Sequence, residues 1–184
     1  MTRLDLFGAP ALVAGRATHA LPLERRHQLV AYLALKRGWV ARAEIAALLW
    51  PDQPERLAST NLRKALFRLQ SSDRLPRIDA DGGALRLLVD TDVDAFERAL
   101  RDERLDDAVG LRRGELLAGY DDDSSEAWTG WLAYERARLR DAWRGAALRR
   151  LDQGIDAEEG IALSAKLLDV DPLDEAALKL HLAW

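Results

Sequence analysis

A segment in the first half of the chain carries the side chains whose types and spacing best suit binding chemistry. The stretch ASTNLRKALFRLQ, residues 58–70, has three cations and no carboxylate, although the whole chain has a formal net charge of −4. Guanidinium and ammonium groups bind phosphates and guanine edges, asparagine amides pair with adenine, and threonine bonds to a base or touches a thymine methyl. The residues of these types are Thr60, Asn61, Arg63, Lys64 and Arg68. They predict a surface that binds double-stranded DNA.

The same segment has the apolar periodicity of a helix with one buried face. At about 100° per residue, the apolar side chains gather around Leu62 and the cations lie on the outer face or at its edge. The predicted core-facing residues are Ala58, Leu62, Ala65, Leu66 and Leu69. A solvated amphipathic helix with a basic surface has the same pattern, and for an isolated helix it is the commoner interpretation. The neighbouring elements decide between the two.

Phe67 also falls on the outer face of this predicted helix. Its ring could touch a thymine methyl in the major groove. It could equally pack beneath the following hairpin or against another subunit. Packing is the preferred interpretation, because an exposed phenylalanine is unfavourable without a partner.

The elements predicted around this helix follow one another closely within about ninety residues. Alternating apolar residues punctuated by glycine and proline indicate a small β-meander at the amino terminus, and helical stripes ended by Gly38 and Pro51 indicate two helices before the basic one. The predicted order is short strands in 1–20, helices at 23–37, around 45–50 and at 54–70, and a hairpin at 76–88. This is the order of a winged helix-turn-helix with an extra amino-terminal sheet.

Local signals define the ends of the basic helix and of the hairpin. Asp52 and Glu55 have the spacing of a capping box that would begin the helix. The Asp81-Gly82-Gly83 turn accepts the positive φ of a tight hairpin. Arg77 and Arg86 flank this turn, and the hairpin is therefore predicted as a wing that reaches phosphates or a minor groove. Taken singly, each arginine is equally well explained as an exposed strand residue.

The second half of the chain differs from the first in charge and in pattern. Residues 1–90 contain 14 Lys and Arg against 9 Asp and Glu, a net of +5, whereas residues 91–184 contain 13 against 22, a net of −9. From Thr91 onward the pattern is helical, starting with a helix at 93–101, and no strand is predicted. We therefore predict two domains, 1–90 and 91–184. The charge division suggests that the basic domain meets a polyanion, and taken alone it is equally well explained as ordinary surface chemistry.

Several groups of residues in the second half have plain structural interpretations. Trp128, Trp131, Tyr134 and Trp143 recur at near-helical spacing, which favours a core over a ligand cage. Arg136, Arg138, Arg140 and Arg144 are predicted to form a solvated face that balances the acidic half. The stretch Asp121–Ser125 lacks the spacing of a calcium loop and is predicted to be a solvated loop.

Motif-level spacing for catalysis or metal binding is missing from the sequence. There is no cysteine, the histidines His19, His27 and His181 are far apart, and neither a Walker loop nor a nucleophile elbow occurs. We therefore expect no enzyme activity, no cofactor and no metal site. The amino terminus does not resemble a signal peptide and no apolar run is long enough to cross a bilayer, so we expect a cytoplasmic protein without membrane contact.

Three stretches resemble one known family. They are LVAYLALKRGWVARAEIAALLWPD at 29–52, ASTNLRKALFRLQ at 58–70 and VDTDVDAFERAL at 89–100, and the last helices, EEGIALSAKLLDVDPLDEAALKL at 158–180, resemble tetratricopeptide-like pairs. On these motifs the chain resembles a bacterial transcriptional activator of the antibiotic regulatory protein (SARP) type. That family joins an OmpR-like winged helix to a helical bacterial transcriptional activation domain (BTAD).

The resemblance implies a fold, a function and partners. The fold would be mainly α with small β elements: a winged helix-turn-helix with β-meander, three helices and hairpin wing, then an all-α tetratricopeptide-like domain, here shortened or truncated. Helix 54–70 would enter the major groove, two copies would bind direct repeats as a homodimer, and the bound protein would recruit RNA polymerase. The family's groove-facing positions match Thr60, Asn61, Arg63, Lys64 and Arg68, whereas Phe67 departs from the small or polar residue expected there.

A different class of function stays open on the sequence alone. The acidic helical half could bind a protein partner while the winged helix serves as a packing or dimer surface. Phe67 and the negative charge of residues 91–184 favour this alternative. DNA affinity that depends on Lys64 and Arg68 would separate the two hypotheses.

Overall fold

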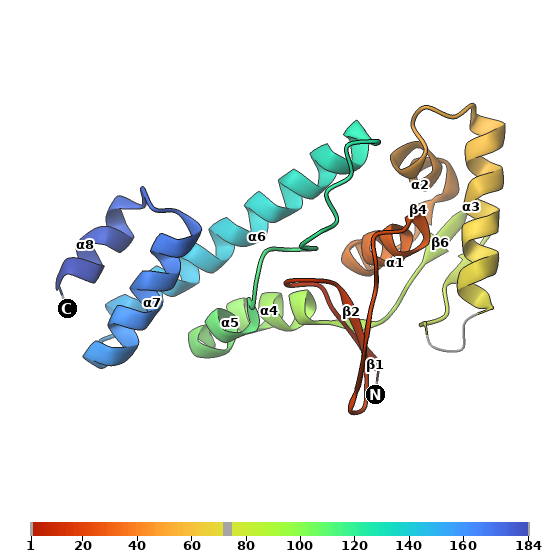
Figure 1. Cartoon of the computed structure of the whole chain (residues 1–184). Helices are drawn as coiled ribbons and strands as arrows, with labels where there is room; N and C mark the ends of the chain where they lie inside the picture. The colour runs from red at the N-terminus through yellow and green to blue at the C-terminus, as the bar shows by residue number, and fades with distance from the viewer. Residues whose placement is uncertain (1, 72–74, 184) are drawn as a thin grey trace.

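The protein is described here from a computed structural model that covers residues 2–71 and 75–183. Two small sheets and three helices form the first half. Among the described residues the second half is helical after the short strand Asp90–Thr91 (Figure 1). The elements are β1 (Thr2–Asp5), β2 (Ala11–Ala14), β3 (Ala17–Ala20), α1 (Arg25–Lys36), β4 (Val40–Ala41), α2 (Arg42–Leu49), α3 (Glu55–Gln70), β5 (Asp79–Asp81), β6 (Ala84–Arg86), β7 (Asp90–Thr91), α4 (Asp92–Arg101), α5 (Leu105–Leu111), α6 (Glu126–Asp152), α7 (Ala157–Val170) and α8 (Glu175–Ala183).

The amino-terminal meander is present and gains a fourth strand that the sequence pattern did not predict. The strand order is β3-β2-β1-β7, with antiparallel pairing within the meander and β7 parallel to β1. The two residues of β7 are too few to produce a strand pattern. The prediction of no strand from Thr91 onward is therefore wrong by one residue.

Helices α1, α2 and α3 form the helix-turn-helix unit at the predicted positions. The five predicted core-facing residues of α3 are all buried, which confirms the helical phase. The predicted capping box is wrong: Pro54 stands at the N-cap without a side-chain hydrogen bond, because the helix begins at Glu55 itself. Helix α1 ends one residue before Arg37, which adopts the left-handed conformation at φ 56° and precedes Gly38.

The predicted hairpin supplies two strands of a three-stranded sheet, with β6 in the centre and β5 at one edge. Strands β5 and β6 pair across a turn in which Gly82 has φ 53°, a conformation that favours glycine. The third strand, β4, pairs with β6 and anchors the hairpin to the start of α2. A two-residue strand between two helices gives no periodic signal, so β4 was not predicted.

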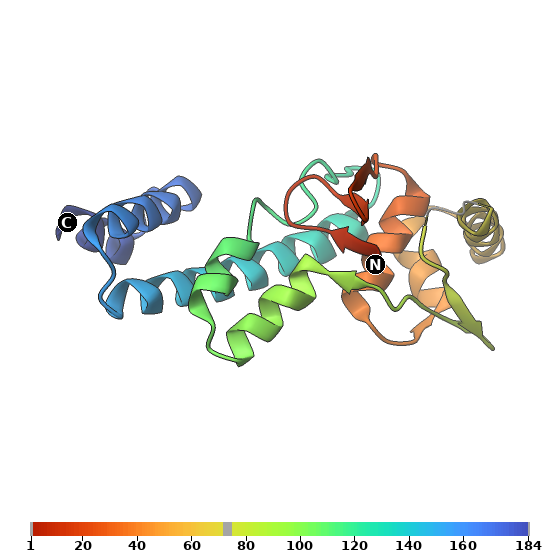
Figure 2. The same ribbon diagram turned by 90° about the horizontal axis from the view of Figure 1, so that it is seen from below.

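The all-helical second half is organised around α6. Thr91 caps α4 and Ser125 caps α6 through their side-chain oxygens, as expected for these residue types. Helix α6 is 27 residues long and runs from the side of α2 to the α7–α8 pair at the opposite end of the molecule (Figures 1 and 2). Its length connects the helix-turn-helix unit with the last helices.

The loop before α6 is the predicted solvated loop only at Asp121, Asp123 and Ser124, which are exposed. The carboxylate of Asp122 pairs with Arg25 and accepts a hydrogen bond from Gln28 at 2.9 Å. The buried Ser125 hydroxyl donates to the carbonyl oxygen of Leu48 at 2.8 Å. These contacts attach the start of α6 to α1 and α2, because a buried polar group is stable only when it has a partner.

The arginines of α6 also differ from the prediction of a solvated face. Arg136 donates to the carbonyl oxygens of Leu116 and Leu117 and pairs with Asp121. Arg138 pairs with Glu97 of α4, and Arg144 pairs with Asp174 before α8. Three of the four therefore join separate elements, a role that helical spacing alone does not reveal. Arg140 is exposed and has no ion pair among the described residues.

The aromatic stripe of α6 is core, as predicted, except for one member. Trp128 and Trp143 are buried and Trp131 is partly buried against Tyr32 of α1, with ring centroids 4.8 Å apart. Tyr134 is exposed, so its assignment to the core is wrong. No helix among the described residues is long and apolar enough to cross a membrane.

Candidate nucleic-acid interface

Helix α3 lies at one edge of the molecule. Helices α1 and α2 lie between it and the later helices, α4 to α8 (Figures 1 and 2). Its inner face packs on α1 and α2 through the buried residues around Leu62. At about 1.5 Å per residue, its 16 residues extend about 24 Å. The opposite face is directed away from the rest of the chain, which is the geometry that a groove-binding helix requires.

The outer face of α3 carries cations without acidic partners. Arg63, Lys64 and Arg68 are exposed, and among the described residues none of them makes an ion pair. Helix α3 contains a single acid, Glu55, in its first turn. Many arginines elsewhere are paired with carboxylates, among them Arg37, Arg138 and Arg144. The charge of this face is therefore available to a polyanion.

Thr60 is placed differently from the free polar residue that we expected. Its hydroxyl donates to the carbonyl oxygen of Arg56 at 2.9 Å and accepts from Arg63 at 3.2 Å. The hydroxyl is thus engaged within the helix, and the methyl group is the part of Thr60 left for an outside contact. Asn61 is half-buried on the same helix, with no side-chain hydrogen bond among the described residues.

Phe67 is not packed within this chain. Its side chain is 73% exposed, so the prediction that it packs beneath the hairpin is wrong. The backbone explains the position: Phe67 is five residues after Leu62, so it is rotated about 140° from the buried face. A contact with another subunit stays a prediction, as does a contact with DNA.

The wing is less basic than its two arginines suggested. Arg77 is exposed in the segment before β5, as a phosphate contact requires. Arg86 instead pairs with Asp79 across the strands at 3.0 Å, and its guanidinium carbon lies 4.5 Å from the centre of the Trp39 ring. Asp81 at the turn is exposed and carries a negative charge. The geometry therefore leaves the Arg77 side chain exposed and gives Arg86 a structural role.

Arg56 was missed among the candidate residues. It is exposed in the first turn of α3 and lies one turn before Thr60 on the same side. Its spacing from Thr60 and Lys64, in steps of four residues, was visible in the sequence. Glu55 beside it interrupts the run of positive charge, and this hides Arg56 from a search for clustered cations.

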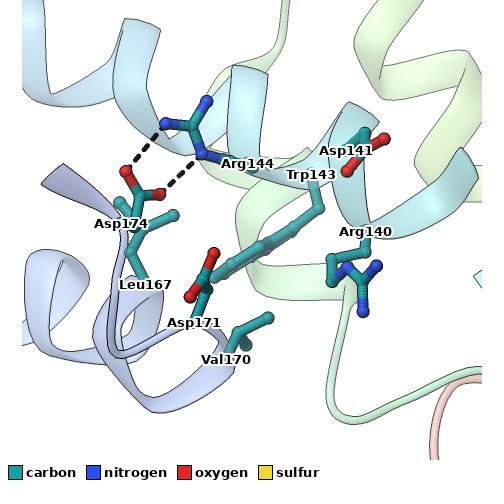
Figure 3. A pocket seen from close by; sticks show the side chains of 8 residues that line it. All are labelled: Arg140, Asp141, Trp143, Arg144, Leu167, Val170, Asp171 and Asp174. Carbon is teal, nitrogen blue, oxygen red and sulfur yellow. Dashed lines mark hydrogen bonds and ion pairs between the residues drawn. The ribbon is translucent and has the colours of Figure 1, made fainter. Parts of the chain in front are cut away.

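A pocket lies where α6 meets α7 and the loop before α8 (Figure 3). Its volume is about 350 Å³, and Figure 3 shows the Trp143 ring between Asp171 and Arg140. Arg144 forms two hydrogen bonds, of 2.6 and 2.7 Å, with the carboxylate of the buried Asp174. That pair holds the pKa of Asp174 below its usual range. The hollow is thus the joint between two helical elements, and no group of metal-binding residues occurs there or elsewhere among the described residues.

The architecture and this surface define a class: a winged helix-turn-helix with an amino-terminal sheet, followed by an all-helical region. Among solved structures, the chain is similar to Mycobacterium tuberculosis EmbR, solved in complex with a low-affinity phosphopeptide, with a TM-score of 0.63 and 17% sequence identity. The match covers 99% of this chain and 54% of the EmbR chain, so this chain spans about half the length of that protein. No protein-family model and no curated protein matches the sequence.

Proposed function

We propose that the protein is a sequence-specific, double-stranded DNA-binding transcription regulator that reads its site with α3. The observation that carries this proposal is the set of exposed cations on the outer face of α3, which make no ion pair with another described residue. A duplex offers closely spaced phosphates, and each cation that neutralises one releases bound counterions. A carboxylate on the same face would oppose binding.

The readout of the site is divided among the residues of α3. Lys64 and Arg68 supply phosphate or guanine contacts, and Asn61 supplies an amide suited to adenine. Arg63 is oriented by Thr60, which reduces the rotamer freedom lost on binding. Arg77 adds a phosphate contact from the wing.

The proposal also includes how the protein assembles on DNA and how it activates transcription. The resemblance to SARP activators supports binding of two copies to direct repeats and recruitment of RNA polymerase. The fold shared with EmbR supports the same architecture over the whole chain. The exposed turn from Pro51 to Glu55 and the wing beside α3 are the surfaces from which a DNA-bound copy would reach polymerase.

Fluorescence anisotropy with random-sequence duplex DNA at two salt concentrations tests the proposal. The parent should bind with an affinity that falls steeply with salt. A Lys64→Ala, Arg68→Ala double variant should show a salt slope smaller by about 0.9 for each phosphate that it no longer neutralises. An Arg149→Ala, Lys179→Ala variant removes two exposed charges from the helical half and is the matched control. It should bind as the parent does.

The competing function is a protein-interaction module, and the exposed Phe67 favours it. It would be supported if the folded parent failed to bind DNA at low salt while a partner remained bound to both variants. Equal losses of DNA affinity in the α3 variant and in the control would show that net charge, and not α3, governs the affinity.

A further inference from the structure

The outer face of α3 carries apolar groups as well as cations. Phe67 is 73% exposed, and Lys64 and Arg68 flank it on the helix surface. The methyl group of Thr60 is the second apolar group, because its hydroxyl is held by Arg56 and Arg63. Neither apolar group contributes to the binding of phosphates.

The spacing of these two groups is regular along the helix. Phe67 follows Thr60 by seven residues, which is a rotation of about 700° and so returns to within about 20° of the same direction. Their separation along the axis is about 10.5 Å. Base pairs rise about 3.4 Å each, so two apolar contacts on a helix lying along the major groove would fall about three base steps apart.

The apolar feature of the major groove is the thymine C5-methyl group, which phenylalanine and threonine methyl groups contact. Adenine, guanine and cytosine present polar atoms at their edges there. Lys64 lies between the two apolar groups along the helix and can reach guanine N7 and O6.

We infer that Phe67 and Thr60 read thymine methyl groups, so that the recognised sequence carries two thymines about three base steps apart, with a position read by Lys64 between them. This inference rests on the proposed function, to which it adds the type of base that is read and the distance between the two bases. Leu57, the other exposed apolar residue of α3, is rotated about 60° from Thr60 around the helix, so it lies off the line that joins Thr60 and Phe67.

The experiment begins with selection of a preferred site by the parent from a random duplex pool. Each thymine of that site is then replaced singly by deoxyuridine, which removes the methyl group and leaves the base pairing intact. Two replacements about three base steps apart should each weaken binding about fourfold, the factor expected for burial of one methyl-sized group.

The variants connect each methyl group with one residue. Phe67→Ala should abolish the effect of one replacement, and Thr60→Ser, which keeps the hydroxyl and removes the methyl, should abolish the effect of the other. Leu57→Ala is the matched control and should leave both effects intact. Circular dichroism of each variant verifies folding.

The outcomes separate this inference from the proposed function. If the parent selects a site and no deoxyuridine replacement matters, or if both effects persist in Phe67→Ala and Thr60→Ser, DNA binding stands and methyl readout is wrong. If no site is selected and no duplex binds, the proposed function itself fails.

Discussion

At the scale of single residues, partners determine what a charged side chain does. The sequence presents Arg77 and Arg86 as an equivalent pair that flanks a turn. In the structure one is exposed, whereas the other is held by Asp79 and stacks on Trp39. An arginine that already has a carboxylate and an aromatic partner gains less from a phosphate.

This difference predicts that one of two matched substitutions weakens DNA binding and that the other lowers stability. Arg77→Gln should reduce the salt slope of DNA binding by about 0.9 and leave the free energy of unfolding unchanged. Arg86→Gln should lower the free energy of unfolding by about 0.5–1.5 kcal/mol, because it removes an ion pair and a cation–π contact at a partly exposed site. Anisotropy titrations and urea unfolding of both variants measure the two effects. Equal salt slopes in the two variants would contradict the assignment.

A second residue-scale prediction concerns acid. Burial alone would raise the pKa of Glu97, but hydrogen bonds from Arg138 and Arg37 outweigh it and hold that pKa below its usual range. A lowered carboxyl pKa adds stability above the unfolded value, about 4.3, and this stability is lost as pH falls through the folded value. The stability difference between the parent and Glu97→Gln should therefore shrink below about pH 4.3. Urea unfolding at several pH values measures it, and a difference independent of pH would contradict the prediction.

At the scale of elements, sequence periodicity predicted the helices and their buried faces, but it did not predict the contacts between one helix and another. The three helices of the helix-turn-helix unit, the hairpin and the buried face of α3 were all predicted, because burial imposes a repeat of 3.6 or 2 residues. Strands β4 and β7 have two residues each, too few for any repeat. The ion pairs of Arg138 and Arg144 depend on which helices meet, which is a property of the tertiary fold.

Much of the candidate site could also be predicted, since helical phase placed the cations of α3 on the exposed face. The lack of ion pairs between those cations and other described residues could not be predicted, because it depends on where the carboxylates lie in the fold. The exposure of Phe67 was likewise hidden, because the same sequence position suits a packed ring and a free one.

The junction of α2 and α6 gives a prediction at this scale. Ser125 caps α6 and also donates to the carbonyl oxygen of Leu48, so Ser125→Ala should cost about 1–3 kcal/mol of unfolding free energy. Asp156→Ala removes an exposed cap of α7 that makes no side-chain bond to another element among the described residues, and it should cost about 1 kcal/mol. Chemical unfolding of the two variants measures the difference, and equal costs would show that the bond to Leu48 adds nothing.

At the scale of the whole molecule, the proposed division near residue 90 is crossed by many contacts. Asp122 binds Arg25 and Gln28 of α1, the Tyr120 hydroxyl donates to the carbonyl oxygen of Leu21, and Trp131 packs on Tyr32. Contacts of this kind make one half depend on the other. The helical half is therefore also a support for the orientation of α3.

These contacts predict one cooperative unfolding transition. Far-ultraviolet circular dichroism follows the helices of the whole chain, and three of the six tryptophans that contribute to the fluorescence lie in α6. The two melting curves should coincide within about 1 °C, as two-state unfolding requires. Separate transitions would show that the halves unfold independently.

The pairing of β1 with β7 has a consequence for the order of events during synthesis. Strand β1 lies between β2 and β7, and Asp92 accepts hydrogen bonds from the backbone N–H groups of Leu6 and Phe7 at 2.8 and 3.0 Å. Strand β1 is synthesised before β7, so one of its edges stays uncovered until residues 90–92 have been made. An edge left open in that interval is a site for wrong pairing with other chains. The short strands of the meander, four residues each, limit this hazard while the chain is still growing.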